Sequence, residues 1–381
     1  MIGNPFSSRD HAWMAQALRL AERGIATTRP NPRVGCVIVR DDAAVGEGWH
    51  ERAGGPHAEV FAMRQAGEAA RGATAYVTLE PCGLHGRTPP CADALIAAGI
   101  ARVVVASEDV AQRDGGALDR LRAAGVVVET GLMRDASREM NRGFFSRVER
   151  GRPWIRLKLA MSLDGRTALA DGRSKWITSE AARADVQRWR ARSCAILTGR
   201  GTVLADDPRL SVRRSRHGFH PNLPPEGEGF VAPLRVVLDS ALRTPRAAHV
   251  LDGSVPTLLM HAPDRQPSDD RFARVECMAI ERGEHGLDLD AMLGALAARG
   301  INEVQVEAGP ILCGALFAAG FVDELLLYVA PVLLGDTARP LLALPTLADM
   351  ASRWSLRMLD QRTVGSEQRL LLRPVSPGQE H

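Results

Sequence analysis

The chain of 381 residues has little of what marks nucleic-acid-binding, membrane or secreted proteins. Aromatic residues make up only 4% of it, so few rings are available for stacking on nucleic-acid bases. The net charge of +3 is nearly balanced and gives no support for a polyanionic partner such as a nucleic acid or a membrane surface. No run approaches about 18 apolar residues, and the first ten residues contain no apolar segment of a secretory signal.

Cysteine is also scarce: six residues do not make a disulfide framework in a chain of this length. Cys36, Cys194, Cys277 and Cys313 lie in or near apolar runs and are expected to be small buried residues. Together with the missing targeting segment, this usage predicts a protein of the reducing cytoplasm. With 45% hydrophobic and 24% charged residues, the chain has the composition of a soluble globular protein, and its length suggests two domains.

The most informative pattern is His57-Ala58-Glu59, followed by Pro81-Cys82 and by Cys91. One histidine and two cysteine thiolates are zinc ligands, and three of them leave a fourth position for water. Zinc deaminases that act on nucleobase-type rings use this arrangement. The sequence therefore predicts one zinc per chain, bound by His57, Cys82 and Cys91. Glu59 is expected to carry protons as the catalytic residue without being a ligand.

A closed structural zinc site with His85 as fourth ligand, or cysteines that merely sit in a core, are the alternatives. The flanking sequence favours an open catalytic site. The β-rich run 74–79 ends just before Cys82, and Pro90 precedes Cys91 and an apolar run, which predicts Cys91 in the first turn of a helix. The positive end of a helix favours the thiolate form that binds metal.

The first 150 residues alternate between helix and strand, which predicts an α/β sandwich with parallel strands at its centre. Helices are expected over 8–23, from His57, from Cys91 and over 118–124. Strands are expected over 34–39, 43–49, 74–79, 103–106 and 126–128, the first two forming a hairpin around Asp41-Asp42. Cys82 would then lie at the carboxyl end of a strand, where ligands bind in such sheets.

Arg150-Gly151-Arg152-Pro153 is a charged break, and the domain boundary is predicted there. The second part alternates again, without repeating the first. Strands are expected over 154–160, 193–198, 234–239, 257–260 and 303–307, and helices over 180–191, 289–298 and 310–319. The stretch 213–233 is rich in proline, glycine, arginine and histidine, which is typical of a surface insertion.

Several motifs occur in a fixed order along the chain. The first part contains Asn31-Pro32-x-Val34-Gly35, Gly46-x-Gly48-x-His50, Gly55-x-His57-Ala58-Glu59, Thr78-Leu-Glu-Pro-Cys82 and Arg87-Thr-Pro-Pro-Cys91. The second contains Lys158-Leu-Ala-Met-Ser-Leu-Asp164-Gly-Arg, Ser174-Lys-Trp176-Ile-Thr178-Ser, Thr202-Val-Leu-Ala-Asp206-Asp-Pro and Glu307-Ala308-Gly309-Pro310. From about residue 8 to about residue 373, the chain resembles the bifunctional riboflavin-biosynthesis deaminase/reductases.

The resemblance implies a cytidine-deaminase-like α/β/α sandwich over residues 1–150 and a dihydrofolate-reductase-like α/β domain over residues 151–381. It implies zinc-dependent hydrolytic deamination of 2,5-diamino-6-(5-phosphoribosylamino)pyrimidin-4-one, followed by reduction of the ribosyl group to ribityl with NADPH. The expected cofactors are one zinc ion and NADPH. The expected partner is the phosphoribosylaminopyrimidine substrate, with no nucleic acid or membrane, in a homo-oligomer.

The same resemblance implies the residues of both sites. Substrate contacts are expected from Asn31, His50, Arg87, Lys158, Ser174, Arg190, Leu210, Arg213 and Glu307. Contacts with NADPH are expected from Ala160, Trp176, Thr202, Asp206, Ser240, Gly309, Pro310, Ile311, Leu312, Cys313, Gly314 and Ala315. Guanidinium groups such as those of Arg190 and Arg213 suit a phosphate, since they donate paired charge-assisted hydrogen bonds.

Four of these residues also have plainer interpretations. Asn31 precedes a proline and could simply form a turn. Arg87 could be a solvated loop residue, Arg190 could belong to the solvated face of a basic helix, and Trp176 could pack in the core. Two other functions also stay open: a zinc deaminase of tRNA or free nucleosides, and a zinc-stabilised regulatory protein that binds pyrimidines without turnover.

One position departs from the family pattern, because Leu84 stands where those enzymes have histidine and His85 follows one place later. The zinc ligands and Glu59 are unaffected, so deamination is expected to survive with one substrate contact missing. One neutral hydrogen bond is worth about 0.5–1.5 kcal/mol, which would appear mainly in KM. Deamination assays of Leu84→His and His85→Ala test this. An inert Leu84→His beside a sharply raised KM in His85→Ala would mean that His85 makes the contact.

Overall fold

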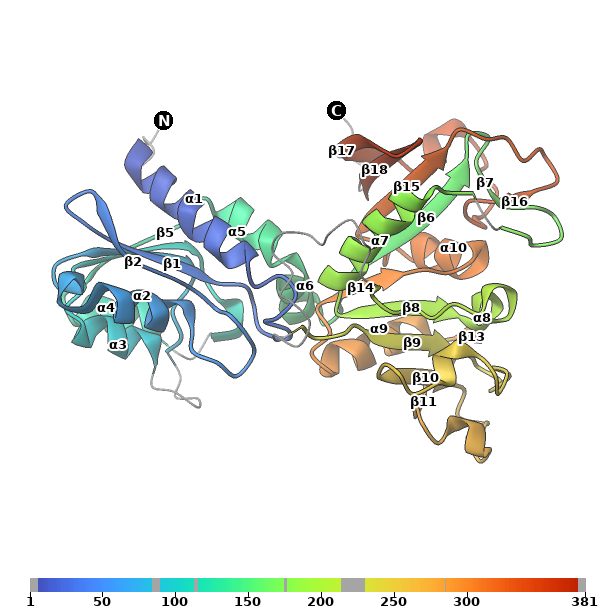
Figure 1. Ribbon diagram of the computed structural model, residues 1–381, viewed down its shortest axis with the longest axis horizontal. Helices are drawn as coiled ribbons and strands as arrows, with labels where there is room; N and C mark the ends of the chain where they lie inside the picture. The colour runs from blue at the N-terminus through green and yellow to red at the C-terminus, as the bar shows by residue number, and fades with distance from the viewer. Residues whose placement is uncertain are drawn as a thin grey trace. The chain divides into compact units, whose positions relative to one another are not determined.

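The computed structural model describes residues 6–83, 90–112, 116–174, 177–213, 230–284 and 286–375 (Figure 1). The chain forms two compact units. The first takes in the described residues up to Gly151 together with residues 230–231, and the second takes in the described remainder from Arg152. Residues 230–231, part of the stretch expected to be a surface insertion, thus belong to the first unit. In the described part of the chain no helix is both long and apolar enough to cross a membrane.

The first unit is built on a five-stranded sheet with the order β2-β1-β3-β4-β5. Its strands are β1 (Gly35–Arg40), β2 (Ala43–Trp49), β3 (Thr74–Leu79), β4 (Arg102–Ser107) and β5 (Val127–Thr130). The last three run parallel, and β1 pairs antiparallel with both β2 and β3. The predicted hairpin is present: Asp41 and Asp42 have φ of 50° and 59°, the left-handed values that suit a two-residue turn between twisted strands.

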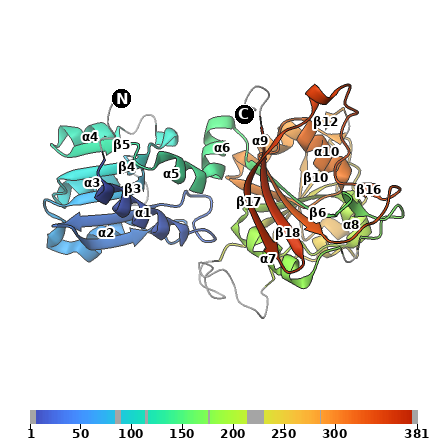
Figure 2. The same cartoon turned by 90° about the horizontal axis from the view of Figure 1, so that it is seen from above.

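Helices cover both faces of this sheet, as Figures 1 and 2 show. On one face α1 (Ser8–Glu22) and α5 (Arg134–Met140) enclose a core with Val37, Val39 and Val104. On the other face lie α2 (Ala58–Ala66), α3 (Cys91–Ala97) and α4 (Ala117–Ala123). The elements η1 (Gly67–Ala70), η2 (Val110–Gln112) and α6 (Arg142–Arg150) complete the unit. The α/β sandwich expected from the alternation is therefore present, with helices on both faces of the sheet as the family resemblance implies.

Glycines let α2 approach the sheet closely. A Cβ atom on Gly46 would lie 2.1 Å from the carbonyl oxygen of Ala62, and one on Gly48 would lie 2.2 Å from that of Ala58. Any side chain at these positions would push the helix away. The glycines of the Gly46-x-Gly48-x-His50 motif therefore set the height of α2 above β2, and α2 begins directly after His57.

The second unit contains a nine-stranded sheet with the order β11-β10-β9-β8-β14-β6-β15-β18-β17. Its strands are β6 (Trp154–Ser162), β8 (Ala195–Gly199), β9 (Leu234–Leu238), β10 (Thr257–His261), β11 (Glu276–Ala279), β14 (Glu303–Val306), β15 (Glu324–Ala330), β17 (Leu356–Val364) and β18 (Glu367–Pro374). All neighbours are parallel from β11 to β15, whereas β18 and β17 add antiparallel strands. Two short pairs join β7 (Arg166–Ala168) to β16 (Arg339–Pro340) and β12 (Arg282–Gly283) to β13 (Gly286–Leu287).

Helices α9 (Leu289–Ala298) and α10 (Pro310–Ala318) pack on one face of this sheet, and α7 (Glu180–Arg192) packs on the other. Helix α8 (Arg200–Asp206) follows β8 directly. Three short 3₁₀ turns complete the unit: η3 (His249–Leu251), η4 (Asp270–Phe272) and η5 (Met350–Ser352). The predicted strands and helices of this unit are present, whereas β15, β17 and β18 at its carboxyl-terminal end were not predicted.

The side chains of β6 alternate between the two faces. Ile155, Leu157 and Leu159 join the core under α9 and α10. Arg156 is fully buried on the α7 face, where it binds Glu324 at 2.5 Å and Glu303 at 3.1 Å. This ion cluster ties β6 to its two neighbours, β14 and β15. Because strand side chains repeat every two residues, Lys158 comes next on that face.

Candidate active sites

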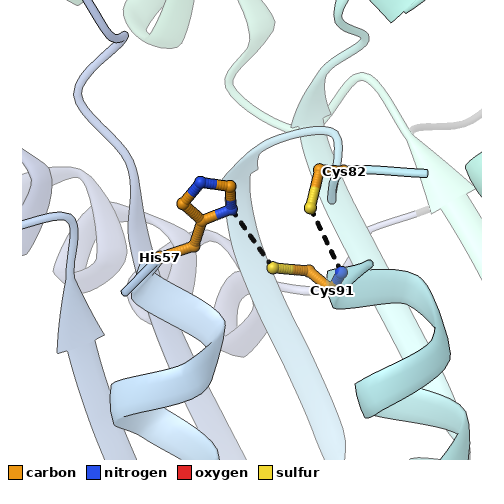
Figure 3. Close-up of side chains that lie close together, drawn as sticks. All are labelled: His57, Cys82 and Cys91. Atoms are coloured by element: carbon orange, nitrogen blue, oxygen red, sulfur yellow. Dashed lines mark hydrogen bonds between the residues drawn. The ribbon is translucent and has the colours of Figure 1, made fainter. Parts of the chain in front are cut away.

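The predicted zinc ligands come together in the first unit from three separate segments (Figure 3). His57 caps the start of α2, Cys82 follows β3, and Cys91 begins α3. Their ligand atoms all lie within 4.8 Å of one another. The Nδ1 atom of His57 lies 3.3 Å from the Cys91 sulfur, and the backbone N–H of Cys91 donates to the Cys82 sulfur at 3.2 Å.

The electrostatics of this group favour a thiolate at Cys82. A hydrogen bond from the Cys91 thiol, helped by one from His57, lowers the pKa of Cys82 to about 4. The same contact between the two sulfurs raises the pKa of Cys91. The hydrogen bond with Cys82 raises the pKa of His57.

Glu59 lies beside the same group in the first turn of α2 and is 2% exposed. Burial raises the pKa of its carboxyl group to about 7. Its Oε2 atom is buried without a hydrogen-bond partner in the described part of the chain. A buried carboxyl oxygen left unpaired is costly, and such groups are expected to meet a ligand or a proton.

This donor set fits zinc. Ligand atoms of a tetrahedral zinc lie about 3.3–3.8 Å from one another, so the observed group needs only a small contraction. A sulfur-rich set with one imidazole is typical of Zn²⁺, and only three protein ligands are present among the described residues. His85, the alternative fourth ligand, lies outside the described residues, and so do Leu84 and Arg87.

The side chain of Asn31 contacts the ring of His50, which is itself held in place by the backbone at Pro56. The side-chain nitrogen of Asn31 lies 3.1 Å from Nε2 of His50, whose Nδ1 lies 3.0 Å from the Pro56 carbonyl oxygen. Burial lowers the pKa of His50, so a neutral ring that donates to Pro56 and accepts from Asn31 satisfies both contacts. The His50 ring meets the His57 ring edge-on, with centroids 5.4 Å apart. His50 therefore links Asn31 to the ligand group.

The packing of α2 leads to one prediction. Gly48→Ala is expected to move α2 and with it His57 and Glu59, because its Cβ would lie 2.2 Å from the Ala58 carbonyl oxygen. A shift of about 1 Å in a catalytic group can cost on the order of 100-fold in rate. Deamination should fall by about that factor while reduction continues, as measured with separate assays. Gly294→Ala, at an exposed helical glycine with open space around it, should leave both activities unchanged.

In the second unit a cavity of about 1680 Å³ opens at the carboxyl ends of the parallel strands. Most of the residues expected to bind substrate or cofactor in this unit line it. They are Lys158, Ala160, Ser174, Arg190, Thr202, Asp206, Leu210, Arg213, Ser240, Glu307, Gly309, Pro310, Ile311, Leu312, Gly314 and Ala315. Cys313 does not line it, since its side chain is fully buried in the core. Trp176 lies outside the described residues.

A buried ion pair forms one wall of the cavity. Arg190 donates to both carboxylate oxygens of Glu307, at 2.6 and 2.7 Å, and its third nitrogen donates to the Ser211 carbonyl oxygen at 2.9 Å. Although burial opposes it, Arg190 lowers the pKa of Glu307 to about 2. Arg190 is 8% exposed, which excludes the solvated helix face. Nearby, burial lowers the pKa of Lys158, whose ammonium lies 6.0 Å from the ring centroid of Tyr328.

The segment after α8 is held in a strained conformation against α7. Leu210 is 2% exposed and has φ of 45°, a left-handed value that is rare for a bulky residue. Such strain costs about 1–3 kcal/mol and is found at functional sites. Gln187 accepts from the backbone N–H of Arg213 at 2.9 Å. The Arg213 guanidinium makes no ion pair with the described residues, and burial lowers its pKa together with the neighbouring Arg190.

The start of α10 supplies backbone donors to the cavity. Gly309 precedes the helix, Pro310 occupies its first turn, and no described side chain caps it. The N–H groups of a first helical turn lack partners within the helix and suit a phosphate. A Cβ on Gly309 would meet nothing within 4 Å, so there is room for a ligand there.

Two family models divide the chain in the same way as the two sites. The model of the cytidine and deoxycytidylate deaminase zinc-binding region matches residues 7–107. The RibD C-terminal domain matches residues 153–367. The riboflavin biosynthesis protein RibD of Escherichia coli K12 is 49% identical over 372 residues, which cover 94% of this chain and 98% of the relative. The chain belongs to the RibD family.

Other RibD proteins agree in sequence and in fold. RibD of Haemophilus influenzae is 46% identical, with 97% of this chain and 98% of the relative covered. The structure of Acinetobacter baumannii RibD, form 1, matches with a TM-score of 0.87 at 44% identity, covering 97% of this chain and 99% of that one. A Thermotoga maritima deaminase/reductase matches with a TM-score of 0.82 at 29% identity, covering 96% and 99%.

Membership of the RibD family confirms the expected fold class and function. The chain is a bifunctional enzyme of riboflavin biosynthesis, with a zinc-binding deaminase domain and an NADPH-dependent reductase domain. A deaminase of tRNA or free nucleosides would leave the second half of the chain unexplained, and a binding protein without turnover does not fit a family of bifunctional enzymes. Both alternatives are therefore excluded.

Several residues that line the cavity were not predicted from the sequence, among them Arg183, Gln187, Tyr328 and Arg339. Arg183 and Gln187 lie seven and three residues before Arg190 on α7, so helical periodicity could have placed them on one face. Tyr328 and Arg339 carry no comparable pattern, because only the arrangement of β15, β16 and β7 brings them to the cavity.

Proposed function

We propose that the first unit deaminates 2,5-diamino-6-(5-phosphoribosylamino)pyrimidin-4-one and that the second reduces the product, 5-amino-6-(5-phosphoribosylamino)uracil, to its ribityl form. One observation carries this proposal: a single chain holds both a His/Cys/Cys group beside a buried glutamate, whose Oε2 has no partner among the described residues, and a large cavity beside a helix start. The Thermotoga maritima relative is named for these two activities, a diaminohydroxyphosphoribosylaminopyrimidine deaminase and a 5-amino-6-(5-phosphoribosylamino)uracil reductase.

The division of labour follows the two units. We assign the zinc-dependent deaminase to residues 1–150 and the NADPH-dependent reductase to residues 151–381. The change of compact unit at Gly151 and Arg152 supports this boundary. Substitutions in one unit should then abolish one activity and spare the other.

For deamination, His57, Cys82 and Cys91 would hold the zinc ion, which when bound makes hydroxide available near neutral pH. Glu59 would carry one proton of the attacking water to the ring nitrogen and the other to the departing amino group, which leaves as ammonia. Its pKa of about 7 suits both roles, since a proton carrier works best near the ambient pH. Asn31, held by His50, would donate to or accept from the polar edge of the pyrimidine. Arg87 would lie near the substrate phosphate.

For reduction, the cavity would hold both ligands, with NADPH as the hydride donor when bound. The first turn of α10 would bind a cofactor phosphate through its backbone N–H groups. Thr202 and Asp206 in α8, together with Ser240 just after β9, would contact the same cofactor. On the α7 side, Lys158 and the Arg190–Glu307 pair would face the pyrimidine and ribose, and Arg213 the phosphate.

A coupled cofactor assay tests this function. NADPH oxidation should require the deaminated pyrimidine, whereas the diamino substrate should support it only after deamination has begun. Removal of zinc with a chelator should stop oxidation with the diamino substrate and leave oxidation with the deaminated one unchanged. NADPH oxidation by both substrates at equal rates without zinc would contradict the proposal.

We also propose that the protein is a homo-oligomer that assembles through the outer edge of β17. This strand ends the nine-stranded sheet, and Leu356, Met358 and Leu359 on it are 39–46% exposed. An exposed apolar edge strand is a ready site for pairing with a second chain. Light scattering should find more than one chain per particle in the unaltered protein. In Met358→Lys the number of chains per particle should fall towards one. A monomer in the unaltered protein would contradict the proposal.

The expected partner is the small phosphorylated substrate, and binding to nucleic acids or membranes is not expected. All six cysteines lack disulfide bonds, and the two in the ligand group must stay reduced to bind zinc. The free cysteines therefore support a location in the reducing cytoplasm. A fluorescent fusion found outside the cytoplasm would contradict this location.

A further inference from the structure

The backbone that follows Cys82 is held by side chains from distant segments. Gln112, the last residue of η2, accepts from the backbone N–H of Gly83 at 2.8 Å. Arg120 in α4 donates through Nη2 to the Gly83 carbonyl oxygen at 2.7 Å. The Cys82 carbonyl oxygen accepts from the backbone N–H of Ala92 at 3.2 Å. Successive polar groups of the backbone after this cysteine therefore have fixed partners.

Arg120 also reaches the segment that carries the other cysteine. Its Nη1 donates to the two carboxylate oxygens of Asp93, at 3.0 and 3.3 Å. Asp93 lies two residues after Cys91 in α3, and Gly83 lies one residue after Cys82. One guanidinium thus connects the two cysteine-bearing segments. The guanidinium is planar and carries five donors in fixed directions, which suits it to make both contacts at once.

The Gln112 side chain is itself oriented. Its amide nitrogen donates to Asp109 at 2.8 Å, which points the amide oxygen towards Gly83. The backbone N–H of Asp109 in turn donates to the side chain of Glu80 at 3.0 Å. Glu80 lies three residues before Gly83 in the chain. The turn that leads from β3 to Cys82 and the turn after β4 therefore form one hydrogen-bonded unit.

These contacts add little to stability by themselves. The Arg120 and Asp93 side chains are 40% and 41% exposed, and ion pairs of this kind are weak because water screens them. Their geometry, by contrast, bears directly on the separation of the two sulfurs. Groups that orient metal ligands typically change metal affinity or activity by about 10–100-fold when removed.

We propose that Arg120 and Gln112 are positioning residues of the deaminase site, which fix the two cysteine-bearing segments at the separation that zinc requires. This inference rests on the proposed zinc site of His57, Cys82 and Cys91. Among the described residues, the two side chains contact the backbone and the carboxylates around the cysteines and not the ligand atoms themselves. Their removal should therefore appear first in how firmly zinc is held, and in deamination only as a consequence.

The decisive experiment compares Arg120→Ala with Arg122→Ala in the full-length protein. Arg122 lies on the same helix and pairs with the exposed Asp119, so both variants lose one charge and one surface ion pair. Zinc loss to a competing chelator should show about 10–100-fold weaker binding in Arg120→Ala and unchanged binding in Arg122→Ala. NADPH-dependent reduction of the deaminated substrate should be unchanged in both.

Two further variants keep the test open if Arg120→Ala folds poorly. Arg120→Lys keeps the charge but replaces the planar fork by a single nitrogen, so it should hold Gly83 and Asp93 less firmly and zinc binding should be intermediate. Gln112→Met keeps the shape without the acceptor and should weaken zinc binding while leaving the melting temperature close to that of Arg122→Ala. Equal zinc affinity in all of these variants and the unaltered protein would overturn the inference. An unaltered protein that binds no zinc would instead refute the proposed site.

Discussion

Glu59→Gln is expected to abolish deamination while zinc stays bound and NADPH-dependent reduction continues. Glutamine keeps the shape of the side chain but cannot accept and return a proton. General acid–base catalysis contributes typically about 10²–10⁴-fold, so at least that much activity should disappear. Glu59 is buried beside the zinc ligands and its Oε2 has no described partner, so the amide should fit in the same space. Ammonia release, zinc content and NADPH oxidation measure the three properties.

Glu68→Gln is the matched control, since it makes the same chemical change at an exposed position of the same unit. It should leave all three properties unchanged. Loss of zinc from Glu59→Gln would show that the carboxylate supports the metal rather than the proton transfer. Residual deamination within tenfold of normal would mean that another group carries the proton.

Arg213→Ala is expected to weaken binding of the phosphorylated substrate to the reductase by about 2–5 kcal/mol, which is roughly 30-fold to several thousand-fold. Arg213 lines the cavity, makes no ion pair with the described residues and has a lowered pKa, chiefly because of burial. A phosphate would supply the missing anion. Titration calorimetry with the deaminated substrate measures the loss, and reduction should show it mainly as a raised KM.

Arg209→Ala provides the comparison for this variant. Arg209 lies on the same segment but is exposed and does not line the cavity. It should change affinity little. A substrate analogue without the phosphate should bind Arg213→Ala and the unaltered protein equally well. If Arg213→Ala instead weakens the analogue as much as the substrate, the residue acts through the fold of the segment and not through the phosphate.

The sequence alone predicted a site of His57, Cys82 and Cys91 beside Glu59, which the structure brings together, and the order of most helices and strands. His57 and Glu59 are two residues apart, and Cys82 and Cys91 are flanked by a strand and a helix, so local patterns carry the chemistry. The reductase residues came instead from the resemblance to a family, because Lys158, Arg190 and Glu307 are spread over 150 positions without a local motif. That most of them line one cavity supports the assignment.

Only the tertiary structure revealed which residues hold the site in place. Arg120 meets Gly83 across 37 positions, and Arg190 meets Glu307 across 117. Such partners are chosen by the packing of helices on the sheet, which hydrophobic periodicity does not specify. The sheet order places β14 between β8 and β6, and with it Glu307 opposite Arg190. Residues that do the chemistry must be of particular types, whereas their supports need only a donor or acceptor at the right place, so sequence patterns identify the first and folding decides the second.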